Sequence, residues 1–513
     1  MSSLLGFSFI GFARGQSRTA PYRAVNPATA TALEPDFFPA TAAEADKACA
    51  LADQATPVLA GLSGQKKAAF LRDIATRIEA ATPALVARAT QETGLPEARC
   101  QGEIGRTMGQ LRLFADLVEK GDWIDARIET ANPDRKPLPK PDHRSLLRPV
   151  GPVAVFCASN FPFAYSVAGG DTASAFAAGC PVIVMAHHAH VGTAEIMGGL
   201  IVEAVKAAGL PEGTFSLLMG EGHVIGQQVA KHPALRAIGF TGSRVGGRAL
   251  MDSAAARPTP IPVYAEMSSV NPVVLLEGAL AARGEAIATG LLGSCTLGVG
   301  QFCTKPGLVF TPKDSDFIST MKSHLATLSV APLLSKSIAE RYSSAIAKLS
   351  SAGKIEVASG AANENGFGVT PTIFITDWAT AAANHELLEE HFGPTTVVIT
   401  CDENQYVEIA SSLQGQLTAT IQGTDADKPA ELLSVLKEKA GRVIWNGFPT
   451  GVAVTSAMNH GGPWPSSSSH TTSVGTDAIY RFMRPVAYQG FAQNVLPEPL
   501  QDANSWAVPQ DIN

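Results

Sequence analysis

The segment GPVAVFCASNFPFAYSVAGGDTASAFAAGCPVIVMA, residues 151–186, decides the fold class of this chain. Residues 151–158 and 180–186 are short, continuous apolar runs, and the alanine-rich residues 171–179 between them have the composition of a helix. A strand that is apolar on both faces is buried on both faces, as in a parallel sheet covered by helices. These residues therefore predict a strand–helix–strand unit of an α/β protein.

The alternation of apolar strands and helices continues in both directions from this unit. A second alternating set runs from 271 to 447, and amphipathic helices fill 41–120, with Gly94 as a helix stop. We therefore expect two α/β lobes that meet near residue 267, with the chain returning to the first lobe after about residue 450. A ligand is expected at the carboxyl ends of the strands. The later elements expected in the first lobe are strands at 214–220, 235–240 and 261–267 and helices at 190–209, 224–232 and 243–256.

Charge and cysteine content exclude several kinds of partner. The formal net charge is -7 and no block of Lys and Arg is present, so we expect neither nucleic acid nor an anionic membrane as the main partner. Seven cysteines without CxxC or zinc-ligand spacing are typical of a reducing compartment. The opening residues lack the basic start of a signal peptide, and no stretch approaches the ~18 apolar residues of a membrane span. The sequence therefore predicts a cytoplasmic protein.

Two cysteines lie in the glycine-rich stretch GSCTLGVGQFCTKPG, residues 293–307. Cys303 follows Gly298 and Gly300, so we expect it in a tight, accessible turn of the kind that a nucleophilic thiol needs. Cys295 lies in helical sequence, where a buried structural thiol is expected. The cysteine predicted to do chemistry is therefore Cys303.

Three polar side chains stand at the ends of apolar elements. Asn160 ends the strand that begins at 151, where a carboxamide can stabilise an oxyanion, although a turn-forming asparagine fits as well. Glu266 ends an otherwise apolar strand, where burial would raise its pKa and suit it to act as a base. Glu390 precedes a strand beside Phe392, and a solvated loop carboxylate is an equal alternative.

One glycine-rich turn suits a phosphate. Gly242, Ser243 and Gly247 lie between a strand and a helix, where free N–H groups and the helix dipole favour an anion. The stretch GEGHVIG at 220–226 is only a near-match to a dinucleotide fingerprint, because its last spacing is one residue too long.

A run of three histidines, His187, His188 and His190, lies at a strand end without further convergent ligands. We therefore predict no metal site.

Together these motifs resemble the aldehyde dehydrogenase family. VNPAT at 25–29, NFP at 160–162, GFTGS, Glu266, GQFC and EHFGP occur in the order and at the separations of that family. The stretches AHHAHVGTAE, GVGQFCTKPG and HGGPWPSSSSHTTSVGT resemble its α-ketoglutaric semialdehyde (2,5-dioxopentanoate) dehydrogenase branch.

The resemblance implies a Rossmann-type cofactor domain, an α/β catalytic domain and a small β arm that builds a homodimer or homotetramer. The expected cofactor domain is 1–120 and 150–266 with a return at about 451–480, the catalytic domain is 267–450, and the arm is 121–149 and 481–513.

The resemblance also implies the chemistry. Cys303 would attack an aldehyde, and the Asn160 side chain with the Cys303 N–H would hold the oxyanion. Hydride would pass to NAD(P), leaving a thioester, and Glu266 would activate water to release a carboxylic acid. The branch implies 2,5-dioxopentanoate as the substrate and 2-oxoglutarate as the product.

A second group of residues is implied to bind the cofactor. Met185 stands where the family usually has a lysine that contacts the adenosine ribose, and His188 stands where NAD-preferring members often have glutamate. Loss of that glutamate favours NADP over NAD. The residues expected to contact the cofactor are Ser159, Met185, His188, Gly242, Ser243, Gly247, Glu390 and Phe392.

The aldehyde tunnel is expected beside Asn160. Phe161, Ala164 and Tyr165 would line it. Arg106 and Gln110 share one helix face (i, i+4) and would hold the substrate carboxylate, with a surface salt bridge as the alternative for Arg106.

Three other functions stay open. A CoA-acylating enzyme would use the same cysteine and asparagine, but such relatives generally lack the glutamate at 266. A medium-chain or fatty aldehyde dehydrogenase of broad specificity would differ only in its pocket lining. The third alternative is not an active enzyme but a relative that binds the cofactor and has lost turnover. Met185 is the single feature that favours it.

Overall fold

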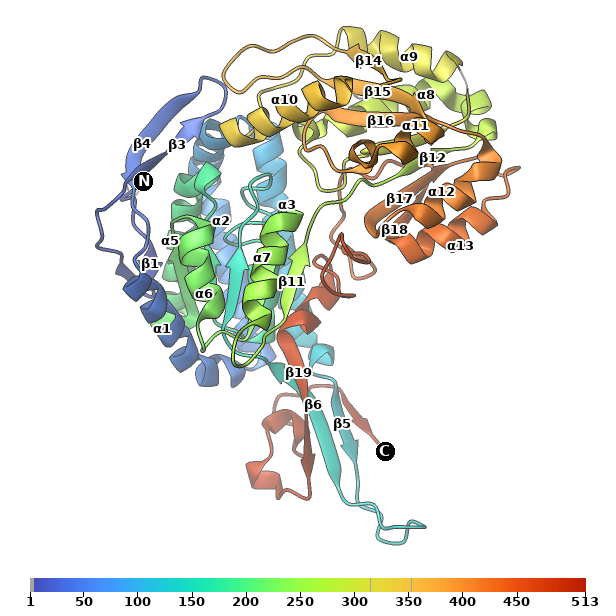
Figure 1. Ribbon diagram of the computed structural model, residues 1–513. Helices are drawn as coiled ribbons and strands as arrows, with labels where there is room; N and C mark the ends of the chain where they lie inside the picture. The colour runs from blue at the N-terminus through green and yellow to red at the C-terminus, as the bar shows by residue number, and fades with distance from the viewer. Residues whose placement is uncertain (1–3, 314, 352) are drawn as a thin grey trace.

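The strand–helix–strand unit lies at the centre of the first sheet in the computed structural model, which describes residues 4–313, 315–351 and 353–513 (Figure 1). Its sheet has the strand order β11-β10-β7-β8-β9-β1-β2. The strands β7 to β11 are parallel, whereas β1 and β2 form an antiparallel hairpin at one edge. The strands are β1 (Phe9–Ile10), β2 (Ala13–Arg14), β7 (Val153–Phe156), β8 (Val182–Met185), β9 (Phe215–Leu218), β10 (Ala237–Thr241) and β11 (Val263–Glu266).

Alternate residues of each central strand face opposite layers of helices. Val153 and Val155 of β7 belong to one buried cluster, and Ala154 and Phe156 belong to another. This separation follows from the two-residue period of a strand and explains why the strand sequences are continuously apolar. The helices of this lobe are α1 (Ala42–Ala60), α2 (Gly64–Thr93), α3 (Glu97–Lys120), α4 (Gly170–Ala178), α5 (Val191–Ala207), α6 (Gln227–Lys231) and α7 (Arg244–Ala255).

The second lobe contains another seven-stranded sheet, of order β14-β15-β16-β13-β12-β17-β18. Its strands are parallel except for the edge strand β14. The strands are β12 (Val273–Leu275), β13 (Leu308–Thr311), β14 (Glu356–Ser359), β15 (Thr372–Asp377), β16 (Thr395–Thr400), β17 (Gln416–Gln422) and β18 (Ala440–Trp445). The helices are α8 (Glu277–Thr296), α9 (Ser315–Ala326), α10 (Lys336–Ser350), α11 (Trp378–Ala383), α12 (Tyr406–Ser412) and α13 (Ala430–Lys439).

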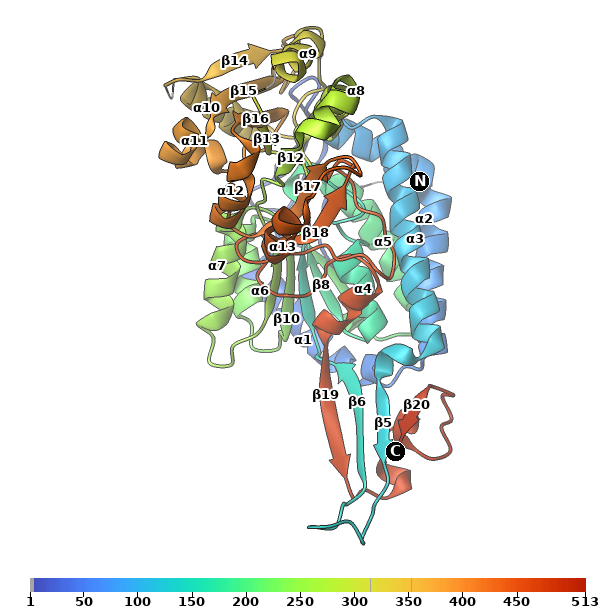
Figure 2. The ribbon, with the colours of Figure 1, turned by 90° about the vertical axis from the view of Figure 1, so that its right-hand side faces the viewer.

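A narrow third sheet projects away from both lobes (Figure 2). It pairs β5 (Ala126–Glu129) and β6 (His143–Pro149) with β19 (Met483–Gln489) and β20 (Gln510–Ile512), so it joins two segments that lie far apart in the sequence. The strands β3 (Tyr22–Asn26) and β4 (Thr31–Phe37) form a separate hairpin along the first lobe.

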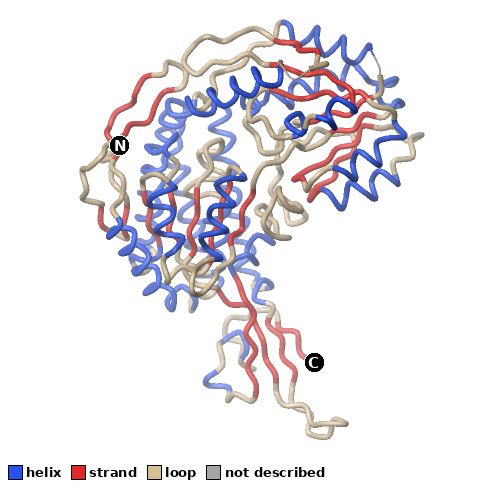
Figure 3. Tube along the Cα trace, in the orientation of Figure 1, coloured by secondary structure: helices blue, strands red, loops and turns tan. Residues whose placement is uncertain are grey.

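The remaining helical turns are short and lie in the connections between these elements (Figure 3). They are η1 (Asp122–Ile124), η2 (His188–His190), η3 (Glu212–Thr214), η4 (Gly222–Gly226), η5 (Leu297–Gly300), η6 (His385–Leu388), η7 (Glu403–Gln405), η8 (Thr476–Phe482), η9 (Gln493–Val495) and η10 (Glu498–Leu500).

The α/β fold class and the predicted strands of both lobes are confirmed by the structure. The helix predicted at 224–232 is partly wrong, because a π-helical turn, η4, precedes the short α6. In the described part of the chain, no helix has the length and apolar content needed to cross a membrane. The first three residues of the range 1–120 lie outside the described residues.

We predict that Gly94→Ala destabilises the protein, because Gly94 ends α2 with a left-handed backbone (φ 66°) and an added Cβ would lie 3.0 Å from Pro27 Cγ. A left-handed conformation costs a residue with a Cβ about 1–2 kcal/mol. The matched control is Gly61→Ala at the end of α1, where φ is -91° and the nearest atom would lie at 3.5 Å. Urea unfolding measures both variants, and equal midpoints would contradict the prediction.

Candidate active site

Two cavities meet at the sulfur-bearing side chain of Cys303. One has a volume of about 540 Å³ and is lined by Asn160, Glu266 and Glu390 among others. The other has a volume of about 310 Å³ and is lined by residues that include Tyr165. Cys303 lines both cavities and is partly exposed, whereas the six other cysteines, Cys295 included, are buried. The structure therefore places this thiol where two different ligands can approach it from opposite sides.

A strained loop presents the thiol. Three consecutive residues before it, Gly298, Val299 and Gly300, have positive φ angles of 57°, 60° and 67°. A β-branched residue such as Val299 rarely adopts this conformation, which costs about 1–3 kcal/mol. Any side chain at Gly300 would collide with the carbonyl oxygen of Gly393. The loop is thus fixed by backbone shape, as the glycines in the sequence predict.

Asn271 and Asn160 hold this loop from two sides. Asn271 Nδ2 donates to the carbonyl oxygens of Cys303 and Lys305 at 2.8 and 2.9 Å. Asn160 Nδ2 donates to the carbonyl oxygen of Gln301 at 2.8 Å. The carboxamide of Asn160 is therefore oriented beside the thiol, and its second N–H hydrogen is left for another acceptor.

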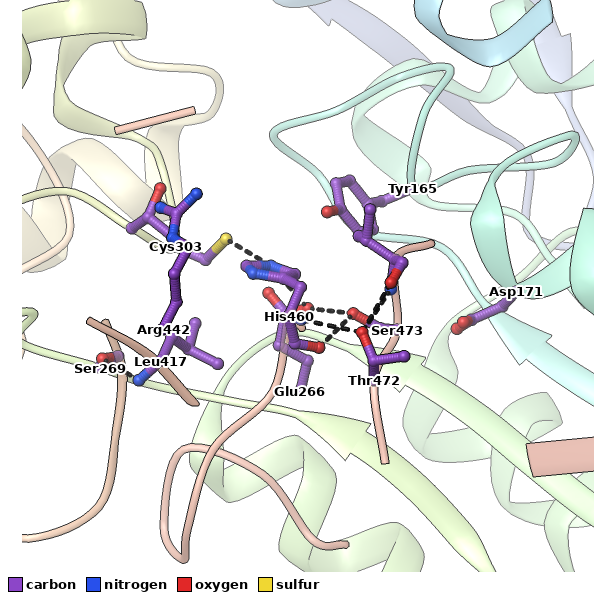
Figure 4. Close-up of polar contacts among 12 residues, drawn as sticks. Tyr165, Asp171, Glu266, Ser269, Cys303, Leu417, Arg442, His460, Thr472 and Ser473 are labelled. Atoms are coloured by element: carbon purple, nitrogen blue, oxygen red, sulfur yellow. Dashed lines mark hydrogen bonds and ion pairs between the residues drawn. The ribbon is translucent and has the colours of Figure 1, made fainter. Parts of the chain in front are cut away.

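A buried polar cluster faces the same sulfur (Figure 4). His460 Nε2 lies 3.6 Å from Cys303 Sγ and 3.0 Å from Glu266 Oε2. Ser473 Oγ donates to the same carboxylate oxygen at 2.9 Å. Glu266 is 4% exposed and His460 is 1% exposed. The three groups that surround Glu266 come from the second lobe (Cys303) and from the returning segment (His460 and Ser473).

The returning segment reaches Glu266 by backbone pairing. Glu266, the last residue of β11, forms an isolated antiparallel bridge with Ser467, and Met267 N donates to Ser466 O at 2.8 Å. Ser473 N donates to His460 O at 2.8 Å, which closes the loop between them. This pairing brings His460 to the buried carboxylate of Glu266.

The structure corrects the expected pKa of Glu266. Burial alone would raise it, but the facing imidazole of His460, the adjacent Cys303 thiol and the Ser473 hydroxyl together lower the pKa below its ordinary value. Burial raises the pKa of Cys303 well above its ordinary value, and the charge of Glu266 adds to this shift. Before reaction the site therefore holds a carboxylate next to a protonated thiol.

His460 and Ser473 are site residues that the sequence did not predict. Both lie at the ends of the polar stretch HGGPWPSSSSHTTS, in which no local pattern distinguishes a buried histidine from a solvated one. The available signal was the predicted return of the chain to the first lobe after about residue 450, which requires some residues of this stretch to lie near the ends of the first sheet's strands.

The larger cavity fits a nicotinamide dinucleotide. It extends to the N-terminus of α7, where Ser243 caps the helix and Val245 is an apolar side chain that is 81% exposed. It ends at Cys303, next to Glu390 and Phe392. A helix N-terminus suits a pyrophosphate, and a carboxylate suits ribose hydroxyl groups. Of the residues expected to bind a cofactor, those lining the cavity are Ser159, Gly242, Ser243, Glu390 and Phe392.

Burial raises the pKa of Glu390 to about 7, although hydrogen bonding with Ser268 and the ammonium group of Lys305 partly offset this. The side chain lines the cavity and is half-buried. Its charge therefore changes near neutral pH, unlike that of a solvated loop carboxylate.

The other residues expected at the cofactor lie elsewhere. Met185 packs in the apolar cluster that includes Phe156 and Leu218, and Gly247 is buried against Met267 Sδ. Neither residue lines the cavity, so their expected contact with the cofactor stays a prediction.

The three histidines after β8 engage local partners. The ring of His187 stacks on His188 and His190, with centroids 4.4 and 5.5 Å apart. His187 Nδ1 accepts from Ala189 N, and His190 Nε2 lies 2.8 Å from Ala158 O. His188 is exposed just after the carboxyl end of the central strand β8 and does not line the cavity.

The smaller cavity has aromatic walls. The ring of Phe161 packs edge-to-face against Phe302 and Tyr165, with centroids 5.0 and 5.1 Å apart. Ala164 is buried behind them and Gln110 turns toward Gly170, so neither lines the cavity. Their expected contact with the substrate therefore stays a prediction.

Arg106 is an unpaired cation in this cavity. Its Nη2 lies 3.4 Å from the hydroxyl of Tyr165, and its buried Nη1 has no hydrogen-bond partner in the described residues. Arg99, its neighbour in the cavity wall, is paired with Glu103 at 2.6 Å. Across residues 4–313, 315–351 and 353–513, Arg106 forms no ion pair, so the surface salt bridge considered for it is wrong.

The protein has two lobes that are each built on a largely parallel sheet, and Cys303 lines a cavity of about 540 Å³. These features suit an NAD(P)-dependent oxidoreductase. The chain belongs to the aldehyde dehydrogenase family, whose sequence model matches residues 12–486. It is therefore an enzyme that oxidises aldehydes.

Full-length relatives support this assignment. An alpha-ketoglutaric semialdehyde dehydrogenase 2 of Azospirillum brasilense is 48% identical, over 99% of this chain and 98% of its own length. An alpha-ketoglutaric semialdehyde dehydrogenase of Acinetobacter baylyi is 45% identical, over 98% and 97%. The crystal structure of lactaldehyde dehydrogenase from Escherichia coli has the same fold, with a TM-score of 0.82 at 21% identity over 94% of this chain and 98% of that one.

Alkylation tests the electrostatics of the thiol. Because the charge of Glu266 raises the pKa of Cys303, Glu266→Gln is expected to speed alkylation of Cys303 by iodoacetamide at neutral pH. A pKa lower by one unit raises the thiolate fraction about tenfold. Peptide mapping separates Cys303 from the six buried cysteines. Glu221→Gln, an exposed carboxylate outside both cavities, is the control, and equal rates in both variants would contradict the prediction.

Proposed function

We propose that this enzyme oxidises 2,5-dioxopentanoate (α-ketoglutaric semialdehyde) to 2-oxoglutarate through a thioester on Cys303. The observation that carries the proposal is Arg106, a half-buried cation in the cavity opposite the cofactor side of the thiol, whose buried Nη1 atom has no hydrogen-bond partner in the described residues. The names of the two relatives at 48% and 45% identity give the same substrate.

The first step is attack of Cys303 on the aldehyde carbon. The thiol has a raised pKa, so it must lose its proton as the carbon–sulfur bond forms. The proton passes to the Glu266–His460 pair, whose nearest atom, His460 Nε2, lies 3.6 Å from the sulfur. The pair shares this proton between the carboxylate and the imidazole and releases it to solvent before the thioester is hydrolysed, which restores the Glu266 carboxylate.

The oxyanion that forms next requires donors. The second N–H of Asn160 and the backbone N–H of Cys303 are proposed to supply them. The Cys303 N–H has no acceptor among the parts of the chain that the structure describes, and the Asn160 carboxamide is fixed by Gln301. Removal of one such donor in an acyl-transfer enzyme typically costs about 10²–10³ in rate.

Ser243, Glu390 and Phe392 are proposed to hold the cofactor in the larger cavity, with Ser159 beside them. Bound NAD(P) supplies the acceptor for the hydride that leaves the substrate. NADP is the proposed preference, since Met185 and His188 carry no negative charge that would repel a 2′-phosphate.

The last step is hydrolysis of the thioester. Glu266 is proposed to take a proton from the attacking water, because its pKa is lowered and it is a carboxylate at neutral pH. Its Oε1 atom is buried without a hydrogen-bond partner in the described residues and is the atom available to that water. This carboxylate favours release of a free acid over transfer to CoA.

The projecting sheet is proposed to join subunits into a homodimer or homotetramer. Its outer strands β19 and β20 each have one unpaired edge within the described chain, and Phe491, Val495 and Ile512 beside them are exposed. Unpaired edges and exposed apolar side chains are features of surfaces that bind another chain. Seven free cysteines suit the reducing cytoplasm, which is the proposed location.

Steady-state kinetics test the substrate. Arg106→Leu is expected to lower kcat/KM for 2,5-dioxopentanoate about 10- to 100-fold, because a hydrogen bond to a charged group is worth about 1.5–3 kcal/mol. The kcat/KM for hexanal, which has no carboxylate, should stay within about twofold. Each aldehyde is assayed with NAD and with NADP, without CoA.

Arg112→Leu is the matched control, since Arg112 lies on the exposed side of the same helix and pairs with Glu79. This variant should leave kcat/KM unchanged for both aldehydes. A wild-type enzyme that prefers hexanal would favour a broad-specificity function and overturn the proposal, as would equal losses for both aldehydes in Arg106→Leu.

The proposed role of Glu390 has a pH signature. Because its pKa is about 7, the carboxylate becomes protonated as the pH falls through neutrality and accepts ribose hydroxyl groups less well. The KM for NAD(P) is therefore expected to rise below about pH 7. Glu390→Gln should have a high KM for NAD(P) that does not change with pH. The control variant Glu389→Gln, which changes the exposed neighbour, should keep the pH dependence of the wild-type enzyme. A pH-dependent KM that persists in Glu390→Gln would refute this role.

A further inference from the structure

Three side chains of different chemistry converge at the thiol. The Cys303 sulfur, a Glu266 carboxylate oxygen and a His460 ring nitrogen all lie within 4.8 Å of one another. Each comes from a different part of the chain, and Glu266 and His460 are almost fully buried. A thiol, a carboxylate and an imidazole are the three kinds of side chain that bind zinc.

The measured separations match those of a metal site. Zinc–sulfur bonds of about 2.3 Å and zinc–nitrogen or zinc–oxygen bonds of about 2.0 Å, at tetrahedral angles, place the ligand atoms roughly 3.3–3.6 Å apart. The observed distances are 3.0 Å from His460 Nε2 to Glu266 Oε2 and 3.6 Å from His460 Nε2 to Cys303 Sγ. The sulfur and the carboxylate oxygen lie within 4.8 Å of each other, so side-chain movements of the order of 1 Å or less would bring all three ligand atoms to one ion.

Two further observations favour a cation here. Glu266 Oε1 is buried and has no hydrogen-bond partner in the described residues, so the carboxylate has unused acceptor capacity. One thiolate and one carboxylate also balance the charge of a divalent ion. The soft sulfur and the imidazole select Zn²⁺ or Co²⁺ over Mg²⁺ and Ca²⁺, which prefer oxygen ligands.

We propose that Cys303, Glu266 and His460 form a reversible zinc site that switches the enzyme off. The incoming ion displaces the proton of the Cys303 thiol to solvent and forms a sulfur–metal bond, while the neutral imidazole and the carboxylate supply the second and third ligands. The fourth position faces the cavities and is left for water. Aldehyde and metal both need the sulfur, so they exclude one another.

Cobalt makes the site visible independently of turnover. Co²⁺ added to the full-length enzyme without cofactor is expected to bind once per chain and to give a thiolate-to-cobalt charge-transfer band with visible d–d bands of tetrahedral coordination. Both should vanish when Zn²⁺ is added. The charge-transfer band should be absent in Cys303→Ala, and the affinity should fall at least about 100-fold in His460→Gln and in Glu266→Gln.

The control is His223→Gln, which removes an exposed histidine paired with Glu221 and should leave the spectrum and affinity unchanged. Zn²⁺ should also inhibit the wild-type enzyme competitively with aldehyde, and a chelator should restore activity. Binding without a thiolate band, or an unchanged affinity in both His460→Gln and Glu266→Gln, would overturn the zinc site. Neither outcome depends on which aldehyde is the substrate, so the site and the proposed function can fail separately.

Discussion

The contact on which this structure depends is the buried carboxylate of Glu266 with its donors. Glu266 ends a strand of the first sheet, Cys303 precedes a strand of the second, and His460 and Ser473 lie on the segment that returns between them. A buried charge is stable only when hydrogen-bonded partners surround it, and removing one partner typically costs about 3–5 kcal/mol. The need to satisfy this carboxylate therefore aligns three distant segments of the chain.

The same contact sets the reactivity of the thiol. Burial of the thiol from water and the neighbouring Glu266 carboxylate raise the pKa of Cys303 and so keep this thiol protonated. In the proposed reaction, the same carboxylate and its imidazole partner accept the proton of the thiol. The left-handed turn at 298–300 fixes the thiol between two cavities. Electrostatics thus decides when the sulfur reacts, and backbone geometry decides from which side each ligand approaches.

The sequence predicts the fold more completely than it predicts the site. Both sheets follow from continuous apolar strands, and the turn before Cys303 follows from its glycines, because these patterns are local. The partners of Glu266 could not be predicted, since His460 is buried only by contacts formed far along the chain. For the same reason the pKa of Glu266 was expected to shift in the wrong direction. The direction of side chains could also not be predicted from the sequence. Gln110 was expected to face the cavity, but its side chain turns toward α4.

The order of Cys303 and His460 along the chain has a consequence for how the site forms during protein synthesis. Cys303 is synthesised 157 residues before His460, so the strands of both seven-stranded sheets are translated while the sulfur still lacks its imidazole neighbour. Domains generally fold as units during synthesis, the N-terminal one first. The nascent polypeptide on the ribosome therefore carries an incomplete site, in which Glu266 gains its imidazole and hydroxyl partners only when the returning segment pairs with the end of β11.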